Sequence, residues 1–125
     1  MAGTITIPLT TLPDGVRAFG PANIANPDTL AVLTVDRTVA GGLNSLTSAT
    51  TIEVAVQQSD DGGVTWFPVV DGIWSGGIIP AFRGGGNATT STAAAYWAPG
   101  TGRQARASLT VAGGPVAVQG TLTIS

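Results

Sequence analysis

The sequence has 125 residues, enough for one domain with a single hydrophobic core. Only 10% of the residues are charged, against ~25% in a typical soluble domain, and the net charge is −2. Five arginines supply all the positive charge, so we expect no basic surface for nucleic acid, and no apolar run is long enough to span a membrane. Histidine and cysteine are absent, which excludes disulfides, the commonest general base and the commonest transition-metal ligand.

Alternation of apolar and polar residues predicts short β-strands separated by turns rich in Gly, Pro and Asn. The expected strands are residues 4–9, 15–19, 30–39, 51–58, 64–70, 93–97, 104–111 and 116–124. Residues 20–29 and 41–48 are expected loops, and Leu43 and Leu46 in the second are expected to cover an edge of the core. Asp71-Gly72 is interpreted as a tight turn, and Gly113-Gly114 as the turn of a closing hairpin. Gly120 is interpreted as a bulge.

No segment carries a sustained helical period with caps, so the predicted fold class is all-β. We expect an antiparallel two-sheet β-sandwich, Ig-like or jelly-roll-like, with about 7–9 short strands and no substantial helix. A small barrel is the alternative. Residues 1–125 are expected to form one domain, whose predicted core is Ile5, Ile7, Leu33, Val35, Ile52, Val54, Val56, Trp66, Leu109, Val111, Leu122 and Ile124.

Residues 59–66 read Ser-Asp-Asp-Gly-Gly-Val-Thr-Trp and follow the predicted strand at 51–58. They contain the pattern Ser-x-Asp-x-Gly-x-Thr-Trp at Ser59, Asp61, Gly63, Thr65 and Trp66, which resembles the Asp-box hairpin of sialidase-type propellers and of many secreted and viral β-proteins. In those families the motif is structural. Asp61 is expected to accept hydrogen bonds from its own turn, Gly63 to adopt positive φ, and Trp66 to pack beneath the hairpin. Because the motif occurs once and the chain is short, a propeller with sialidase activity is not expected.

The acidic residues offer no pattern for catalysis. A glycosidase needs two carboxylates about 5–9.5 Å apart across a cleft, whereas Asp60 and Asp61 are adjacent at a turn tip. No His or Lys is present to activate a Ser or Thr nucleophile, so we predict no enzyme activity and no catalytic residue. No cofactor or metal site is predicted; a calcium ion held by Asp60, Asp61 and carbonyl groups of the hairpin tip is the alternative.

Two segments are candidates for contact with other molecules. Residues 1–8 are predicted to form an N-terminal arm or an edge strand, and they lack the basic and apolar regions of a signal peptide. Residues 83–92 are predicted to be a flexible Gly-rich loop. The candidate partner-contact residues are Ile5, Ile7, Arg83, Trp97 and Arg103.

Taken whole, the chain resembles small β-sandwich virion proteins of tailed bacteriophages. Residues 56–66 and 109–124 carry this resemblance and cover about a quarter of the chain. It implies a non-enzymatic structural virion protein, foremost a capsid decoration (cement) protein that binds the outer head shell. The implied partner is the major capsid protein or another virion subunit, and the implied location is the virion, assembled in the host cytoplasm. A homo-oligomer is expected, a trimer by analogy with the shell's local threefold positions, without nucleic acid or membrane as partner.

Two other functions remain as alternatives, a phage tail component and a carbohydrate-binding or adhesion module. For the second, Trp74, Tyr96 and Trp97 would form a stacking platform for sugars, although core or subunit contacts are the simpler interpretation of these aromatic residues. A surface with so little charge is weakly protected against association, which favours a permanent partner.

Overall fold

Eight β-strands form the framework of the chain. The computed structural model describes residues 3–23, 30–47, 49–75, 90–96 and 103–124. A short 3-10 helix, η1 (Leu43–Ser45), is the one helical element in these ranges, and none of the described helical structure is long and apolar enough to cross a membrane. The strands are β1 (Gly3–Leu12), β2 (Gly15–Asn23), β3 (Leu30–Asp36), β4 (Thr51–Ser59), β5 (Phe67–Ser75), β6 (Thr90–Tyr96), β7 (Gln104–Ala112) and β8 (Val116–Ile124).

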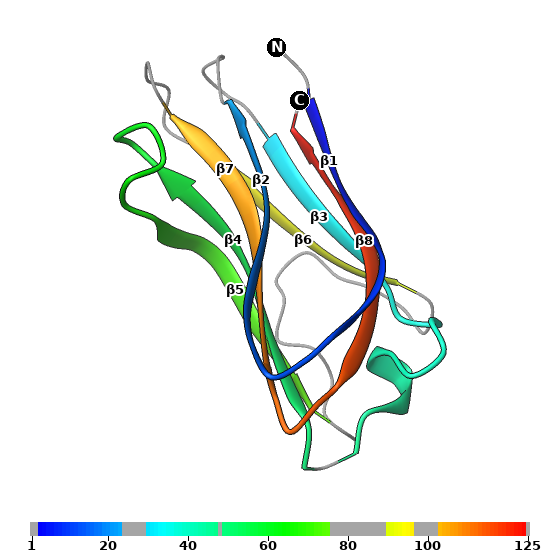
Figure 1. The fold of residues 1–125 in the computed structure, drawn as a ribbon. Helices are drawn as coiled ribbons and strands as arrows, with labels where there is room; N and C mark the ends of the chain where they lie inside the picture. Colours follow the sequence, from blue (N-terminus) through cyan, green and yellow to red (C-terminus); the bar gives the residue numbers. More distant parts are fainter. Residues whose placement is uncertain (1–2, 24–29, 48, 76–89, 97–102, 125) are drawn as a thin grey trace.

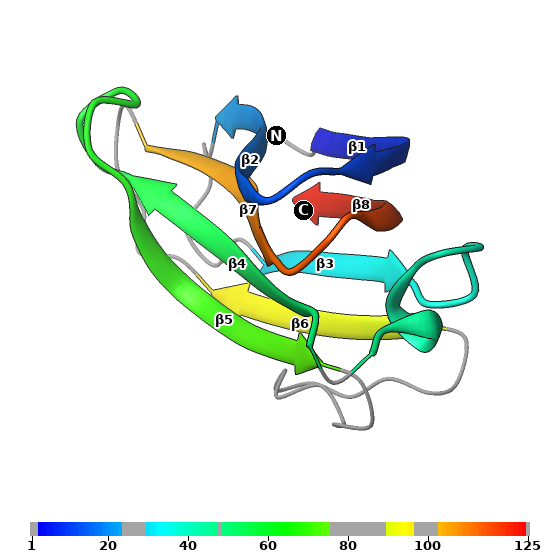
Figure 2. The same ribbon diagram turned by 60° about the horizontal axis from the view of Figure 1, so that its bottom comes forward.

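The strands are arranged in two antiparallel sheets that pack face to face (Figures 1 and 2). We call the sheet with strand order β1-β8-β3-β6 sheet A and the sheet with order β2-β7-β4-β5 sheet B. Only β4 and β5 are both consecutive in the described chain and neighbours in one sheet; every other connection changes sheet. This is the strand order of an eight-stranded jelly roll. The predicted all-β two-sheet sandwich is therefore confirmed, in its jelly-roll form.

Several predicted turns and strand limits are wrong. The hairpin predicted around Gly113-Gly114 does not form, because β7 pairs with β2 and β4 whereas β8 pairs with β1 and β3. The two glycines instead take the chain from sheet B to sheet A. Asp71-Gly72 is not a turn either, since both residues lie inside β5 and pair with Ala55 and Val54. The returning strand of the Asp-box hairpin begins at Phe67, three residues later than expected at 64.

The core lies between the sheets and is built from alternate residues of each strand. In β7, for example, Ala105, Ala107, Leu109 and Val111 are buried while the residues between them are more exposed, apart from Ser108. All residues of the predicted core are buried except Trp66. Burying one Leu or Ile completely stabilises the fold by roughly 1.5–3 kcal/mol. Alternating sequence thus accounts directly for a two-layer structure.

The ladder between β1 and β8 is interrupted next to Gly120. Ile7 pairs with Gly120 and Thr10 with Val118, so Pro8 and Leu9 together lie opposite the single residue Gln119. The bulge expected at Gly120 is therefore found in this ladder, but the extra residue belongs to β1. A Cβ on Gly120 would collide with the carbonyl oxygen of Thr34 on the neighbouring strand, which explains the glycine.

The connections at one end of the sandwich are fastened to each other. The Asp14 carboxylate lies between β1 and β2 and accepts a hydrogen bond of 2.6 Å from the amide of Gly114, which lies between β7 and β8. In the loop before β4, Leu43 is buried and Leu46 packs against the core, as predicted. These contacts hold the loops that cover the core against the two sheets.

Candidate functional site

The Asp-box hairpin is closed by its own side chains. The Asp61 carboxylate accepts hydrogen bonds from the amides of Val64, at 3.1 Å, and Thr65, at 2.8 Å. The Ser59 hydroxyl donates to Asp61 at 2.7 Å and accepts from the Gly63 amide at 2.9 Å. These bonds favour the ionised carboxylate, the Thr65 amide most strongly, and lower the pKa of Asp61 to about 2. Gly63 has a φ of 97°, a backbone conformation that is unfavourable for residues with a Cβ atom.

Trp66 lies on the outer side of the hairpin and not in the core. Its indole Nε1 donates to the carbonyl oxygen of Gly63 at 3.1 Å. The guanidinium carbon of Arg106 lies 4.2 Å from the centroid of the ring, in cation–π geometry. Arg106 Nε also donates to Gln57 Oε1 at 2.8 Å. The prediction of Trp66 as a core residue is wrong because Arg106 and Gln57 project from the outer face of sheet B, and the ring stacks there.

The candidate partner-contact residues are scattered. Ile5 and Ile7 are in β1, and both side chains are buried in the core. Arg103 forms an ion pair of 2.9 Å with Asp60 of the same chain. Arg83, Trp97 and all of 83–92 except the first residues of β6 lie outside the described residues. Residues 3–8 belong to β1, which lies at one edge of sheet A.

Asp60 and Asp61 bind groups of the protein itself. Asp60 accepts from Gln58 Nε2 at 2.6 Å in addition to its ion pair with Arg103, and Asp61 is surrounded by the amides of its turn. Both carboxylates of the calcium alternative therefore have protein partners. Within the described residues, no group of three or more Asp, Glu, His or Cys side chains could hold a metal ion. Of the predicted aromatic platform, Trp74 and Tyr96 lie in β5 and β6, and Trp97 lies outside the described residues.

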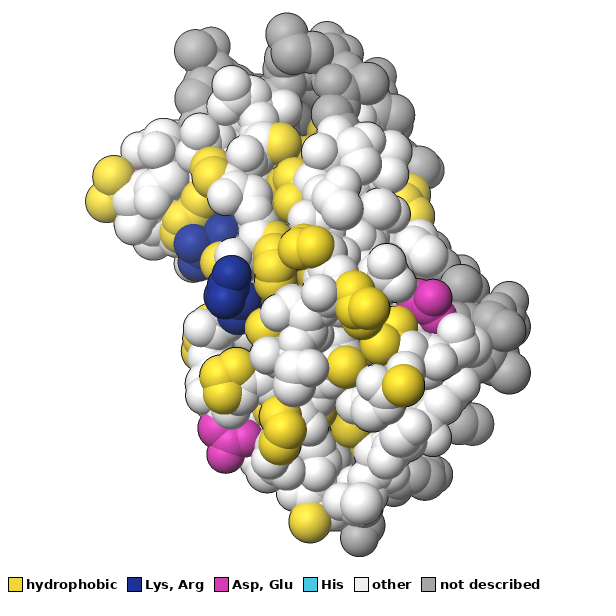
Figure 3. All heavy atoms as spheres, turned by 45° about the vertical axis from the view of Figure 1, so that its right-hand side comes forward, with side chains coloured by type: hydrophobic (Ala, Val, Ile, Leu, Met, Phe, Trp, Pro, Cys, Tyr) yellow, Lys and Arg dark blue, Asp and Glu magenta, His cyan; other side chains and the backbone are white. Residues whose placement is uncertain are grey.

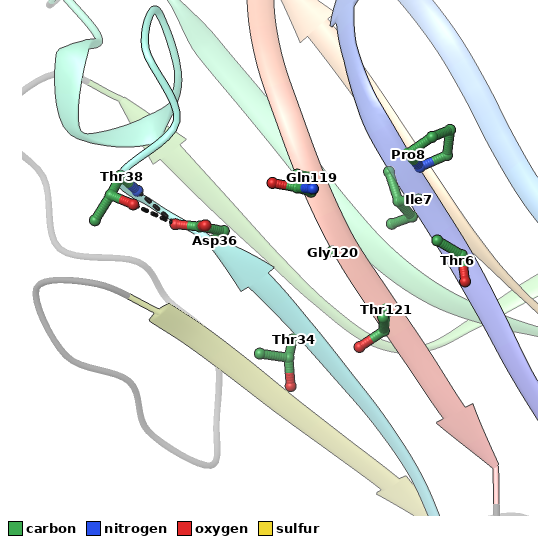
Figure 4. A pocket seen from close by; sticks show the side chains of 9 residues that line it. All are labelled: Thr6, Ile7, Pro8, Thr34, Asp36, Thr38, Gln119, Gly120 and Thr121. Atoms are coloured by element: carbon green, nitrogen blue, oxygen red, sulfur yellow. Dashed lines mark hydrogen bonds between the residues drawn. The ribbon is translucent and has the colours of Figure 1, made fainter.

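A shallow groove crosses the outer face of sheet A and is a candidate binding site (Figure 4). Its volume is about 540 Å³, within the range of small-molecule sites. Figure 4 shows side chains from three neighbouring strands, β1, β8 and β3, around it. The lining residues are Thr6, Ile7, Pro8, Thr34, Asp36, Thr38, Gln119, Gly120 and Thr121.

The exposed lining of this groove is mostly apolar, and threonine hydroxyls are the commonest polar side-chain groups in it. Thr6 pairs with Thr121, and Thr121 pairs with Thr34, so one row of threonines runs across three strands. At the end of β3, the Asp36 carboxylate accepts hydrogen bonds from the Thr38 hydroxyl, at 2.7 Å, and the Thr38 amide, at 2.8 Å. These two bonds lower the pKa of Asp36, the hydroxyl having the larger effect. The groove can therefore donate hydrogen bonds to a neutral polar ligand and accept hydrogen bonds from it.

Sequence reasoning missed the groove. The signal was present as Thr-x-Thr in two places, Thr4-Ile5-Thr6 and Thr121-Leu122-Thr123, because alternate residues of a strand share a face. The sequence does not indicate that the first predicted strand pairs with the last, and this pairing brings the threonines together. Strand order between sheets depends on contacts more than 100 residues apart in sequence, and no local pattern encodes it.

The surface around β1 has few charges. Figure 3 shows the side of the molecule that carries β1 and β8, where apolar and uncharged polar side chains cover most of the described surface. Leu9 is 62% exposed and Val16 is 71% exposed, although both are large aliphatic residues. Such side chains are ordinary when isolated, but on a surface without charges they favour association.

The chain matches no protein-family model, no curated protein and no solved structure.

Proposed function

We propose that this protein is a non-enzymatic structural component of a bacteriophage virion, foremost a decoration protein bound to the outside of the head shell. The observation that carries the proposal is the use of its carboxylates. Asp14, Asp36, Asp60 and Asp61 each hold a turn, a connection or an ion pair of the fold. Acidic groups used in this way serve stability, which is what a shell protein requires of them.

The surface supports the same proposal. A surface with few charges and with exposed aliphatic side chains gives a freely diffusing monomer little protection against association; only 10% of the residues of this chain are charged. A compact jelly roll with a neutral surface is well suited to permanent contact with neighbouring subunits, and jelly rolls occur in many viral capsids. This part of the support is an analogy between folds. The resemblance of residues 56–66 and 109–124 to virion proteins points the same way.

The test is to find the protein on particles. Antibodies against the purified chain should label the heads of the phage that encodes it, at regular positions over the shell. Mass spectrometry of the same particles should detect it in copy numbers comparable with those of the major capsid protein. Label confined to tails would instead support a tail component, and absence from purified particles would refute a structural role in the virion. A trimer at the shell's threefold positions stays a prediction.

A carbohydrate-binding module is the second candidate, and the threonine-lined groove on sheet A favours it. Hydroxyl groups, the Gln119 amide and the Asp36 carboxylate are the groups that hydrogen-bond sugar hydroxyls. Screening the chain on a glycan array, followed by calorimetry with any hit, tests this function. Binding that Gln119→Ala abolishes would support it, whereas silence across the array would count against it.

A further inference from the structure

Strand β1 leaves one edge of sheet A open. The sheet order is β1-β8-β3-β6, so β1 has a partner on one side only. Its neighbours among the described elements are β8 in the same sheet and β2 in the facing sheet. Figures 1 and 2 show β1 on the outside of the sandwich in both views. An edge of this kind presents unpaired main-chain donors and acceptors and can pair with a further strand.

Two of the three other edge strands, β2 and β5, carry features that oppose such pairing, whereas β6 has no charge, no proline and no irregularity in its ladder with β3. In β2, Arg17 pairs with the core residue Leu109, and its guanidinium lies 5.3 Å from the Phe19 ring centroid. A charge in the core-facing register of an edge strand opposes the addition of another strand. In β5, Pro68 lacks an amide proton and lies beside a register shift in the ladder with β4.

The first half of β1 has no such protection. Pro8 and the bulge at Pro8-Leu9 interrupt the strand at its middle, but residues 3–7, Gly-Thr-Ile-Thr-Ile, contain no charge, no proline and no irregularity in their ladder with β8. Thr4 and Thr6 are exposed on the outer face, and Ile5 and Ile7 are buried on the inner face. A strand added here would continue both faces of sheet A.

The sequence of this segment identifies a second copy of the chain as the occupant. Thr4-Ile5-Thr6 reads the same in both directions, so two antiparallel copies place threonine opposite threonine and isoleucine opposite isoleucine. Cross-strand pairs of threonines and of β-branched residues are favourable, whereas like charges directly opposite one another are destabilising. A strand without charges therefore has nothing to oppose its pairing with itself.

We propose that residues 3–7 of β1 pair in antiparallel register with the same residues of a second copy, around a twofold axis at Ile5. Thr4 of one copy then lies opposite Thr6 of the other, and the two four-stranded sheets become one continuous sheet. Main-chain hydrogen bonds supply the affinity, as in other cases of strand addition. This contact is independent of the proposed virion function, because it requires no shell protein.

The oligomeric state of the full chain, alone in solution, tests the proposal. Sedimentation equilibrium over a concentration series should give twice the chain mass of 12.4 kDa. In Thr4→Lys/Thr6→Lys, each new lysine lies opposite a lysine of the other copy, and the dissociation constant should rise at least about tenfold. The matched control, Thr11→Lys/Thr123→Lys, adds the same charge at exposed positions outside residues 3–7 and should remain dimeric.

Charge reversal makes the register itself testable. Thr4→Glu/Thr6→Glu should be monomeric alone, and an equimolar mixture with the lysine variant should restore the dimer as a heterodimer, because Glu then lies opposite Lys. Circular dichroism confirms that each variant is folded. A monomeric or trimeric wild-type chain, a lysine variant that dimerises as well as the control, or a mixture that stays monomeric would overturn the proposal. None of these outcomes depends on whether the chain binds a head shell.

Discussion

Replacing Leu109 with Ala tests whether the buried faces of the two sheets hold the domain together. Leu109 lies in β7, pairs with Arg17 on one side and Val54 on the other, and is completely buried. The substitution removes three carbon atoms, a transfer loss of about 2.4 kcal/mol at ~0.8 kcal/mol per methylene. Strands on both sides limit collapse into the space, so a residual cavity should bring the total to about 3–4 kcal/mol.

A loss of this size is a large part of the roughly 5–15 kcal/mol that stabilises a domain. At about 3–5 °C per kcal/mol for this chain length, the melting temperature should fall by roughly 10–20 °C. Calorimetry and urea denaturation followed by tryptophan fluorescence measure both quantities. The matched control is Leu9→Ala, the same change at a side chain that is 62% exposed, which should cost less than about 1 kcal/mol. Equal losses in the two variants would refute the assignment of Leu109 to the core.

Three further substitutions test the hydrogen bonds and close contacts of the fold. Folding lowers the pKa of Asp61 from about 3.9 to about 2, so the stabilising effect of its carboxylate is complete above pH ~4 and is lost as the pH falls towards 2. The difference in melting temperature between wild type and Asp61→Asn should therefore disappear between pH ~4 and 2. A difference that stays constant over this range would contradict the role of Asp61. Gly120→Ala places a methyl group against the Thr34 carbonyl and should lower the free energy of unfolding, measured by urea denaturation, by about 1–3 kcal/mol. An unchanged midpoint would show that the neighbouring strand moves to accommodate the methyl group without loss of stability. Asp14→Ala removes the bond to the Gly114 amide and should cost about 1 kcal/mol, whereas Asp14→Asn should retain part of it; equal stability of all three proteins would mean that this bond contributes nothing.

Local patterns were sufficient to predict the strands and most of the core. Alternation in residues 51–58 and 104–111 has one physical cause, the opposite orientation of successive side chains, and it acts within a few residues. The Asp-box loop was predictable for the same reason, since Ser59, Asp61 and Gly63 bind each other across four residues or fewer. Even there, the position of Trp66 depended on Arg106, forty residues away, which no local pattern indicates.

Strand order was not predictable, because glycine turns look the same whether the chain returns to its own sheet or crosses to the other. Gly113-Gly114 crosses, and the glycine of Asp71-Gly72 does not turn at all but pairs with Val54 inside a sheet. The groove on sheet A and the open edge of β1 are both products of this order. Several of their residues are ordinary threonines in the sequence, and the pairing of β8 with both β1 and β3 brings these threonines together.

The place of β8 between β1 and β3 also has a consequence for biosynthesis. During translation, β1 is synthesised first and β8 last among the described strands. The strand that connects β1 to the rest of sheet A, β8, is therefore the last to become available. Pairing across such a sequence separation is slow, because closing the long loop between the two strands costs entropy before their contacts form. Sheet A is therefore completed only after translation has passed residue 124, and a nascent chain that stalls earlier leaves two strands without their shared neighbour.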